Sequence, residues 1–312
     1  MKNRVVTITG SSGFVGQILC AQLSRLGFRI RPFDRISPLR GMLLNRRFFG
    51  TAPSGPAAFL SNHIRALQRR HAARLTSCRT NDDFLDERVR LTEKFRGSDA
   101  VIHLAGIPHP FATGACAEDF RRINYDGAIN VFEAARDAGV KKFIFASSGQ
   151  VYRINAPIRI DQFPILETNY LPTLEEGQST YGFMKAEFER YLSRACTTGS
   201  TQAIALRLEF PGFRSSLAAR NFFTSTSVDN LANGFAAAIN APDTFAAEAF
   251  NLVDAEVDKG IVDIQEYVKQ NWPDVPNHTR GNESLVSTEK ARRMIGYRPI
   301  SNGVYFRPEV VN

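Results

Sequence analysis

A tyrosine and a lysine, Tyr181 and Lys185, stand four residues apart, a spacing that puts two side chains on one face of a helix. A phenol with its ordinary pKa of about 10 is a poor base near neutrality. A neighbouring ammonium stabilises the ionised form, so we expect Lys185 to lower the pKa of Tyr181 and fit it for acid and base catalysis. An isolated pair of this spacing is more often exposed on a solvated helix, but three further segments favour the catalytic interpretation.

The first of these segments is a glycine-spaced turn near the amino terminus. An apolar, strand-like run that begins at Val6 enters this turn and leaves it as an amphipathic helix. The first glycine permits a tight turn, the second lets the backbone approach a pyrophosphate, and the third lets helix and strand pack closely. Free N–H groups at the helix start would face the anion. We expect the phosphate-binding residues to be Gly10, Ser12, Gly13, Phe14, Val15 and Gly16.

The next strand-like stretch, residues 28–34, ends in an acid at the distance from Gly16 that is typical of dinucleotide-binding folds. There the carboxylate of Asp34 can accept hydrogen bonds from both hydroxyls of an adenosine ribose. This favours NAD over NADP, because Asp34 would repel the 2′-phosphate of NADP. Arg35 follows directly and works against that preference.

The second segment, residues 100–106, is a continuous apolar run typical of a buried strand in a parallel sheet. It ends in small or apolar residues where a nicotinamide or ribose can lie, Leu104, Ala105 and Gly106. His103 falls inside the strand, so we interpret it as a structural histidine rather than a catalytic one.

Upstream of that strand, Asp83 and Phe84 precede a short helix predicted over residues 87–95. Asp83 is placed to accept a hydrogen bond from the adenine amino group. The alternative is that Asp83 caps the helix, a role that aspartate also fills well.

The third segment, residues 142–152, is another strand-like run, with Ser147 and Ser148 near its carboxyl end. Open α/β sheets bind ligands at this edge, and a serine there can hydrogen-bond a substrate hydroxyl or carbonyl. A simple turn serine is the alternative, but the Tyr181 helix follows further along the chain and favours the functional interpretation.

With these motifs in order, the chain resembles the extended short-chain dehydrogenase/reductase family of NAD-dependent epimerases and dehydratases. The motifs read TGSSGFVG, HLAG, ASSGQVY and YGFMKAEFE, and the resemblance spans residues 1 to about 37 and 80 to about 300. It implies an α/β fold, a Rossmann-type doubly wound parallel sheet with a small carboxyl-terminal substrate lobe.

The resemblance also implies the roles of four residues. Tyr181 is the acid and base, and Lys185 binds the nicotinamide ribose and lowers the Tyr181 pKa. Ser148 orients the reacting oxygen, and Asn124 lies where the family keeps a helix asparagine that supports the lysine. The helices that begin near Asp119 and Tyr181 are those the family uses for a two-fold homodimer.

Length and composition agree with one α/β unit. The 312 residues, 43% of them hydrophobic, can bury a full core, and we expect an NAD-binding domain over residues 1–210 and a small, interleaved substrate lobe over residues 211–312. The four cysteines lack paired or metal-type spacing, so no metal site is expected. The first strand leaves no room for a secretion signal, and no apolar stretch is long enough to span a bilayer, so a cytoplasmic protein without a membrane span is expected.

The net charge of +8 has a local source. Residues 36–81 hold eight arginines and no Lys, Asp or Glu, and the rest of the chain carries equal numbers of basic and acidic residues. No nucleic-acid partner is therefore expected. The segment is longer than a usual connection and includes a third strand near residues 74–78. Three interpretations of this segment stay open: a disordered or poorly packed insertion, a contact for a partner or an anionic surface, and a direct role in cofactor binding.

The residues beyond the serine bear on the substrate. Sugar-nucleotide dehydratases of the family carry an acidic pair where this chain has Gly149 and Gln150, so dehydration is disfavoured. Phe210 stands where epimerases often carry an asparagine. Only a short stretch separates Pro211 from Val228, whereas nucleotide-sugar enzymes usually need a longer one to hold the diphosphate. A small substrate is therefore favoured.

This shortened layout resembles uronate dehydrogenases. Arg220 matches the arginine with which those enzymes hold the substrate carboxylate, and a planar guanidinium suits that task; a surface arginine is the alternative. The Glu209 carboxylate would repel an acid substrate if it faced the pocket. His109 follows the HLAG strand and is either a part of the loop structure or a donor to a sugar hydroxyl.

The sequence therefore predicts an NAD-dependent oxidoreductase acting on a secondary alcohol or lactol of a small, sugar-like substrate. One alternative is an NAD-dependent sugar or nucleotide-sugar epimerase, which uses the same oxidation transiently. The other is a non-catalytic, dinucleotide-binding regulatory protein, since folds of this type also serve as sensors.

Overall fold

The computed structural model describes nine segments of the chain, residues 3–36, 82–108, 115–152, 159–171, 180–197, 201–213, 222–260, 262–301 and 303–305. The arginine-rich segment lies outside the described residues apart from Ile36, and so does the strand predicted within it. His109 and Arg220 also lie outside them, so their proposed substrate contacts stay predictions.

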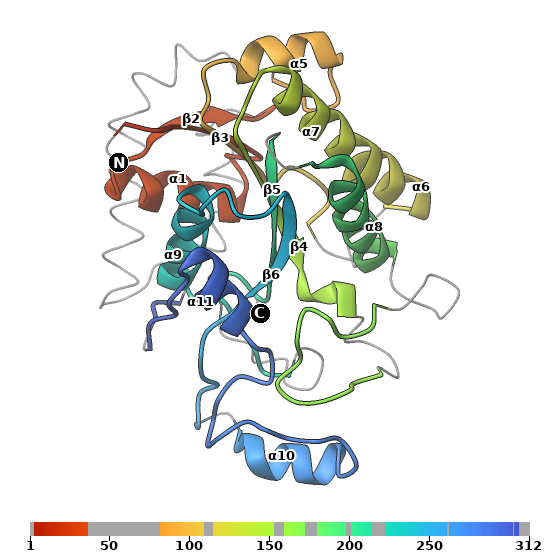
Figure 1. Ribbon diagram of the computed structural model, residues 1–312, viewed down its shortest axis with the longest axis vertical. Helices are drawn as coiled ribbons and strands as arrows, with labels where there is room; N and C mark the ends of the chain where they lie inside the picture. The colour runs from red at the N-terminus through yellow and green to blue at the C-terminus, as the bar shows by residue number, and fades with distance from the viewer. Residues whose placement is uncertain are drawn as a thin grey trace, which may run out of the picture.

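The described chain is built on one sheet of six parallel strands in the order β2-β1-β3-β4-β5-β6 (Figure 1). The strands are β1 (Val5–Thr9), β2 (Arg29–Phe33), β3 (Ala100–His103), β4 (Lys142–Ser148), β5 (Gln202–Leu208) and β6 (Ala247–Leu252). Sequential strands run outward in both directions from β1, with a helical connection between parallel neighbours. This confirms the predicted doubly wound, Rossmann-type α/β fold.

Helices cover both faces of the sheet (Figure 1). One face carries α1 (Phe14–Arg25), α9 (Val228–Ile239) and α11 (Glu289–Ile295). The other carries α5 (Arg88–Phe95), α7 (Gly127–Asp137) and α8 (Thr180–Ala195). The shorter turns are α6 (Ala117–Phe120), the π-helix η1 (Arg121–Asp126) and the 3₁₀-helix η2 (Gly149–Tyr152).

The alternation of side chains along the strands makes two separate cores. Ile8, Ile144 and Ile204 point to the α1 and α9 face, whereas Val101 and Phe143 point to the α7 and α8 face. All of these side chains are fully buried. A strand that is buried on both faces is apolar at most positions, which explains the nearly continuous apolar runs of the sequence.

A third core lies below the carboxyl ends of the strands and includes α10 (Ile264–Asn271), at the foot of Figure 1. Its buried members come from both sides of residue 210, among them Tyr152, Phe163, Phe222 and Leu285. We interpret this cluster as the core of the predicted smaller lobe, whereas α9 and β6, which also follow residue 210, belong to the sheet layers. The cluster borders the edge of the sheet where the predicted site residues lie.

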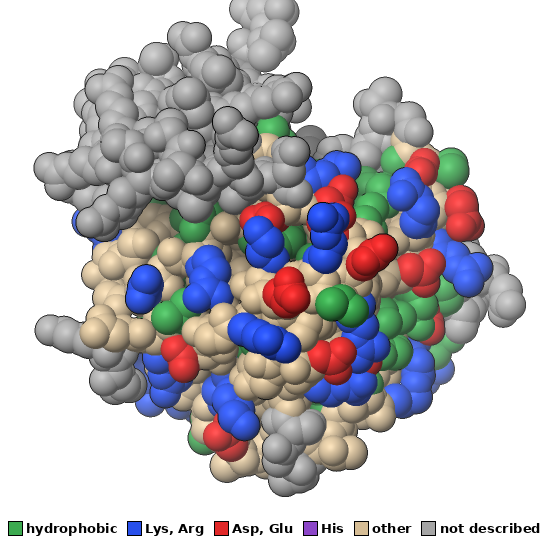
Figure 2. All heavy atoms as spheres, turned by 90° about the horizontal axis from the view of Figure 1, so that it is seen from above, with side chains coloured by type: hydrophobic (Ala, Val, Ile, Leu, Met, Phe, Trp, Pro, Cys, Tyr) green, Lys and Arg blue, Asp and Glu red, His purple; other side chains and the backbone are tan. Residues whose placement is uncertain are grey.

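The described surface mixes charges of both signs. On the face seen in Figure 2, basic and acidic side chains are interspersed rather than gathered into a basic patch. Ion pairs account for part of this pattern, such as Arg88 of α5 with Asp137 and Glu133 of α7. Among the described helices, none combines the length and apolar character needed to cross a bilayer.

Candidate active site

The turn after β1 brings backbone against backbone. Gly10 has a φ of +70°, and a Cβ on it would lie 2.7 Å from the amide nitrogen of Ala105, beyond the end of β3. A Cβ on Gly16 would lie 2.2 Å from the carbonyl oxygen of Gly10, and one on Gly13 would lie 3.2 Å from the same atom. Contacts this short exclude a side chain at Gly10 and Gly16. The turn is therefore a bare backbone cradle at the start of α1, which fits a pyrophosphate.

The carboxylate of Asp34 lies beside this cradle at the end of β2. One oxygen accepts a hydrogen bond from Ser12 N at 2.9 Å, and the other accepts one from Ile36 N at 3.1 Å. The Ser12 hydroxyl donates to the Ile36 carbonyl at 2.7 Å, which ties the two turns together. Two backbone donors thus fix the carboxylate, and its remaining lone pairs can accept ribose hydroxyls.

Asp83 adopts a turn-forming arrangement next to this end of the sheet. Its Oδ1 accepts a hydrogen bond from Leu85 N at 3.0 Å, and its Oδ2 lies 3.6 Å from Nη1 of Arg35. The helix α5 begins later, after Glu87, so Asp83 caps the preceding turn rather than the helix itself. Arg35 thus follows Asp34 in the chain and pairs with Asp83, and these are the two acids predicted to hold the adenosine half of the cofactor. Phe84 packs edge-on against His103.

His103 is structural, as its position in the strand suggests. Its Nδ1 lies 2.8 Å from the Thr9 hydroxyl, and its ring lies among the rings of Phe143 and Phe145. Burial, with a smaller effect of Lys185, lowers the pKa of His103 to about 3, so the imidazole is neutral near pH 7. Ala105 N also lies 3.4 Å from the Thr9 hydroxyl, which holds the end of β3 against the glycine turn.

Asn124 lies in the middle of the π-helix η1 and is buried. Its Oδ1 accepts from Ile107 N at 2.7 Å, and its Nδ2 donates to Ile107 O at 3.0 Å. Gly106 has a φ of +150°, and a Cβ there would lie 2.7 Å from the same Oδ1. The asparagine therefore fixes the chain just beyond β3, where the cofactor contacts of Leu104, Ala105 and Gly106 are predicted. Single-turn π-helices of this kind are frequent at functional sites.

Tyr181 and Ser148 form the centre of the site. Tyr181, on the first turn of α8, interacts with the side chain of Ser148 at the end of β4. The sequence predicts a lowered phenol pKa, whereas in the structure the pKa of Tyr181 is raised to about 12. Burial is the main cause and the charge of Glu209 adds to it, while the Ser148 side chain acts in the opposite direction. In this arrangement Tyr181 holds its proton near pH 7 and is a proton donor.

Lys185 lies on the same face of α8 as Tyr181. Its Nζ is 5.7 Å from the centre of the Tyr181 ring, 4.4 Å from that of Phe145, and donates to Ala146 O at 2.8 Å. Burial lowers the pKa of Lys185 to about 7, although the charge of Glu189 acts in the opposite direction. The ammonium points to the backbone of β4 rather than to the phenol oxygen, which explains why its charge does not lower the Tyr181 pKa here.

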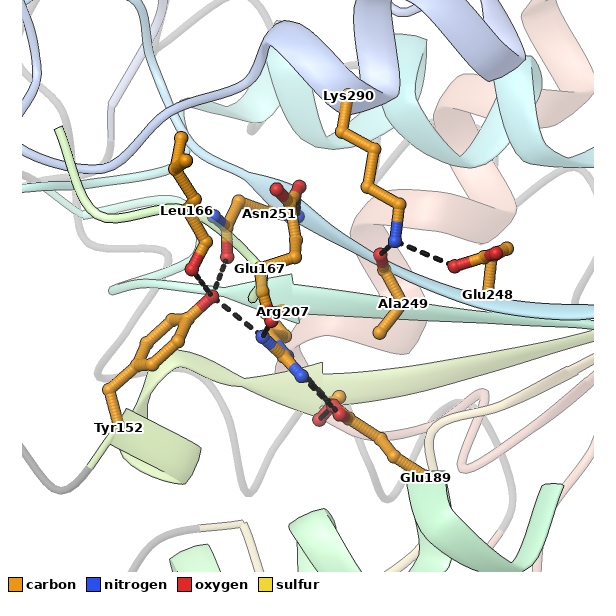
Figure 3. Close-up of polar contacts among 10 residues, drawn as sticks. Tyr152, Leu166, Glu167, Glu189, Arg207, Glu248, Ala249, Asn251 and Lys290 are labelled. Atoms are coloured by element: carbon orange, nitrogen blue, oxygen red, sulfur yellow. Dashed lines mark hydrogen bonds and ion pairs between the residues drawn. The ribbon is translucent and has the colours of Figure 1, made fainter. Parts of the chain in front are cut away.

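A buried ion pair joins the helix α8 to the strand β5, next to the strand that carries Ser148 (Figure 3). Nη2 of Arg207, in β5, lies 2.6 Å from Oε2 of Glu189, in α8, and both side chains are less than a tenth exposed. The other oxygen of Glu189 accepts from the Ser147 hydroxyl at 2.5 Å. Arg207 also donates to the Tyr152 hydroxyl at 2.6 Å, and that hydroxyl donates to Asn251 of β6 at 2.8 Å.

Sequence reasoning missed this network, although a signal was present. Arg207 is a charged residue inside a strand whose other members are almost all apolar. Such a side chain has to find a partner when it is buried. Glu189 follows Tyr181 on the same helix and supplies that partner. The pair connects the helix of Tyr181 to the strand next to Ser148.

The described residues show further details of the site. The ring of Phe14, at the start of α1, stacks on that of Phe213 beyond β5 at 4.7 Å, so it closes one side of the glycine turn. Within the described segments, no group of three or more His, Cys, Asp or Glu side chains could hold a metal ion.

The buried Lys185 leads to a prediction about stability. A lysine whose pKa is lowered on folding binds a proton more weakly in the folded state, so it destabilises the fold when both states are protonated. This destabilisation has its full size below the folded pKa of about 7, and it decreases between pH 7 and the ordinary lysine pKa of 10.5. We expect Lys185→Met to raise the free energy of unfolding most at pH 6 and less at pH 9, measured by urea denaturation. A stability difference that grows with pH would contradict this account of the lysine.

Comparison with known proteins shows which family and which relatives the chain resembles. The family model described as "NAD dependent epimerase/dehydratase family" matches residues 6–211. UDP-glucose 4-epimerase of Bacillus subtilis is 27% identical over 210 residues, which cover 67% of this chain and 52% of that protein, so the match spans about half of that relative. L-arabinose 1-dehydrogenase (NAD(P)(+)) of Haloferax volcanii is 39% identical over 64 residues, which are 20% of this chain and 24% of that protein.

A similar solved structure is that of glucuronic acid dehydrogenase from Chromohalobacter salexigens. It has a TM-score of 0.58 at 18% identity, over 96% of this chain and 85% of that one, a likeness of fold. The predicted family is confirmed, and NAD, the predicted cofactor, is the one after which the family is named. The glycine turn, Ser148, Tyr181 and Lys185 lie at or next to the carboxyl edge of the sheet. By its match to the family model, this chain belongs to the NAD dependent epimerase/dehydratase family.

Proposed function

We propose that this chain is an NAD-dependent oxidoreductase acting on a secondary alcohol or lactol of a small sugar-like molecule, with uronic acids as one candidate class. The observation that carries the proposal is the interacting pair of Tyr181 and Ser148 at the carboxyl edge of the sheet. Lys185 lies one helical turn further along the same face of α8. This set of groups can hold one substrate oxygen and move one proton.

The residues around the glycine turn fit NAD. Gly10 and Gly16 pack directly against neighbouring backbone, so the turn at the start of α1 is tight and presents bare backbone, as a pyrophosphate site requires. The Asp34 carboxylate is fixed by two backbone donors and is suited to the ribose hydroxyls. Lys185 is the group that we propose for the second ribose. When bound, NAD supplies the hydride acceptor, and the protein supplies position and proton transfer.

The protein's own groups divide the remaining work. The Ser148 hydroxyl donates to the reacting substrate oxygen and holds it at Tyr181. In alcohol oxidation, Tyr181 accepts the hydroxyl proton; in the reverse direction it returns that proton to the carbonyl. Because burial raises the Tyr181 pKa to about 12, the phenol is ready as an acid, and proton removal depends on stabilisation of the phenolate. We expect alcohol oxidation to become faster as the pH rises above neutrality.

A small substrate is supported by the chain beyond β5. Gly212 N donates to Thr226 O at 2.8 Å, so the chain after Pro211 returns to its starting point within a short stretch. Ser227 then begins α9 as its cap, because its hydroxyl accepts from Asn230 N. Little chain is left at this position to enclose a nucleotide diphosphate.

Epimerisation is the second candidate function, because the Bacillus subtilis relative bears the name of an epimerase. An epimerase oxidises the substrate transiently and returns the hydride to the other face, so the same Tyr181, Ser148 and Lys185 would serve. A sugar that is converted without net formation of NADH would favour it. A regulatory protein that only binds dinucleotides would need none of these three residues.

The proposal is tested by incubating the purified protein with NAD and a panel of aldoses, polyols and uronic acids. NADH absorbance reports net oxidation, and chromatography of the sugars reports epimerisation. A homodimer through the helices near Asp119 and Tyr181, a cytoplasmic location, and substrate contacts by Arg220 and His109 stay predictions.

Tyr181→Phe is expected to lower kcat by roughly 10²- to 10⁴-fold, the usual contribution of a positioned acid or base. Its NAD affinity should stay unchanged, because the phenol proton is used in the transition state. Calorimetric titration with NAD and steady-state kinetics check the two parts. Tyr191→Phe, on the same helix but bonded to Glu133, is the matched control and should keep its activity. Full activity in Tyr181→Phe would rule out the catalytic assignment.

Asp34→Ser is expected to weaken NAD binding and to improve the relative affinity for NADP, because it removes two ribose contacts and one charge that repels a 2′-phosphate. Asp34→Asn keeps an acceptor for the Ser12 or Ile36 amide and separates the loss of charge from disturbance of the turn. The readout is the ratio of the dissociation constants for the two cofactors. A wild-type protein that already prefers NADP would show that Arg35 dominates.

A further inference from the structure

The last residues of β4 extend beyond its neighbour β3. In the described sheet, Phe145 is the last residue of β4 opposite β3, whereas pairing with β5 continues to Ser148. Ser148, which is proposed to hold the reacting oxygen, therefore ends a strand that is paired on one side at this point. Such a strand end is less restrained than the doubly paired part of the sheet, so the position of the serine hydroxyl depends on further contacts.

The helix α8 supplies these contacts through two side chains that are one turn apart. Lys185 Nζ donates to Ala146 O at 2.8 Å, and Oε1 of Glu189 accepts from the Ser147 hydroxyl at 2.5 Å. Both side chains of the helix are less than a tenth exposed. Consecutive residues of β4, directly before Ser148, are thus bonded to the helix whose first turn carries the proposed proton donor.

Arg207 holds the Glu189 carboxylate in this orientation (Figure 3). Arg207 is the residue of β5 directly opposite Ser147 in the sheet. Its Nη2 lies 2.6 Å from Oε2 of Glu189 and its Nε lies 3.1 Å from Oε1, so the pair is bidentate. One carboxylate therefore bonds two residues that face each other on neighbouring strands. A buried ion pair is a weak source of stability, because the loss of hydration offsets much of the attraction, so we interpret this pair by the geometry that it fixes.

We propose that Glu189 is a positioning residue that, through Ser147, holds Ser148 in register with the proton donor on α8. The inference rests on the proposed function and adds a residue that acts through others rather than on the substrate. Loss of the bond between Glu189 and Ser147 would release the end of β4 from the helix. A displacement of about 1 Å at a reacting group can lower a rate on the order of 10²-fold, so this contact affects turnover more than stability.

Ser147→Ala tests the contact, because it removes the bond to β4 and leaves the buried ion pair in place. Ser98→Ala is the matched control: Ser98 lies just before β3, and its buried hydroxyl is hydrogen-bonded to that of Thr7 at 2.7 Å. We expect Ser147→Ala to lower kcat at least roughly tenfold at unchanged KM, and the control to keep both values. The assay uses a sugar that the wild type converts, and kcat is expressed per NAD site counted by calorimetry, so that a loss of folded protein is not mistaken for slower turnover. A kcat equal to that of the control would overturn the inference.

Ser147→Thr and Ser147→Val separate the hydroxyl from packing. Both substitutions add a similar volume, but threonine alone keeps a hydroxyl for Glu189. We expect the kcat of Ser147→Thr to exceed that of Ser147→Val at least roughly tenfold. Equal values for the two variants would show that packing, and not the bond to Glu189, governs turnover.

The role of Glu189 itself is tested together with its partner, because Glu189 cannot be removed alone without leaving the buried charge of Arg207 without its counter-ion. In Glu189→Leu/Arg207→Met both charges are absent, and we expect kcat to fall as far as in Ser147→Ala. Adding Ser147→Ala to this variant should cause no further loss, since both changes break the same bond. A further, additive loss would contradict the proposed path through Ser147.

Hydrogen exchange separates this inference from the proposed function, because it needs no substrate. Mass spectrometry of the peptide that contains β4 should show faster amide exchange at its carboxyl end in Ser147→Ala and no change there in Ser98→Ala. Unchanged exchange in Ser147→Ala would overturn the inference. If the exchange changes as expected but the wild type converts none of the sugars, the proposed function fails while the support of β4 by Glu189 stands.

Discussion

The site depends on one close approach, between the backbone turns that follow β1 and β3. Gly10 lies so near Ala105 that a Cβ at position 10 would touch its amide nitrogen, and Thr9 holds both His103 and Ala105 through one hydroxyl. Because the sheet is parallel, the carboxyl ends of the other strands lie at the same edge as this contact. Asp34 is then tied to the glycine turn, and Ser148 ends its strand at the same edge.

Burial governs the electrostatics at that edge. It raises the pKa of Tyr181 and lowers those of Lys185 and His103, so it shifts all three side chains toward their neutral forms. Glu209 raises the pKa of Tyr181 further, whereas Glu189 works against the effect of burial on Lys185. A site arranged in this way holds a proton on the phenol until a bound ligand changes the charges around it. The buried ammonium of Lys185 lowers the stability of the fold, although the same group is proposed to bind the cofactor.

Much of the fold was predictable because its signals are local. Continuous apolar runs indicated the parallel strands, and the helix predicted over residues 87–95 matches α5. The Arg207 and Glu189 pair joins segments 18 residues apart, and spacing does not report which charges meet. The pKa of Tyr181 escaped prediction for a related reason, because the direction in which Lys185 points and the depth of burial are tertiary properties.

A crystal structure of the protein with NAD would show the position of the cofactor without the need for a substrate. We expect the pyrophosphate to lie over Gly10, Gly13 and Gly16, with the adenosine ribose on the Asp34 carboxylate. The nicotinamide ring should lie beside Tyr181, with its ribose hydroxyls bonded to Lys185. A nicotinamide directed away from Tyr181 and Ser148, or a dinucleotide bound elsewhere than the carboxyl edge of the sheet, would contradict this placement of the cofactor.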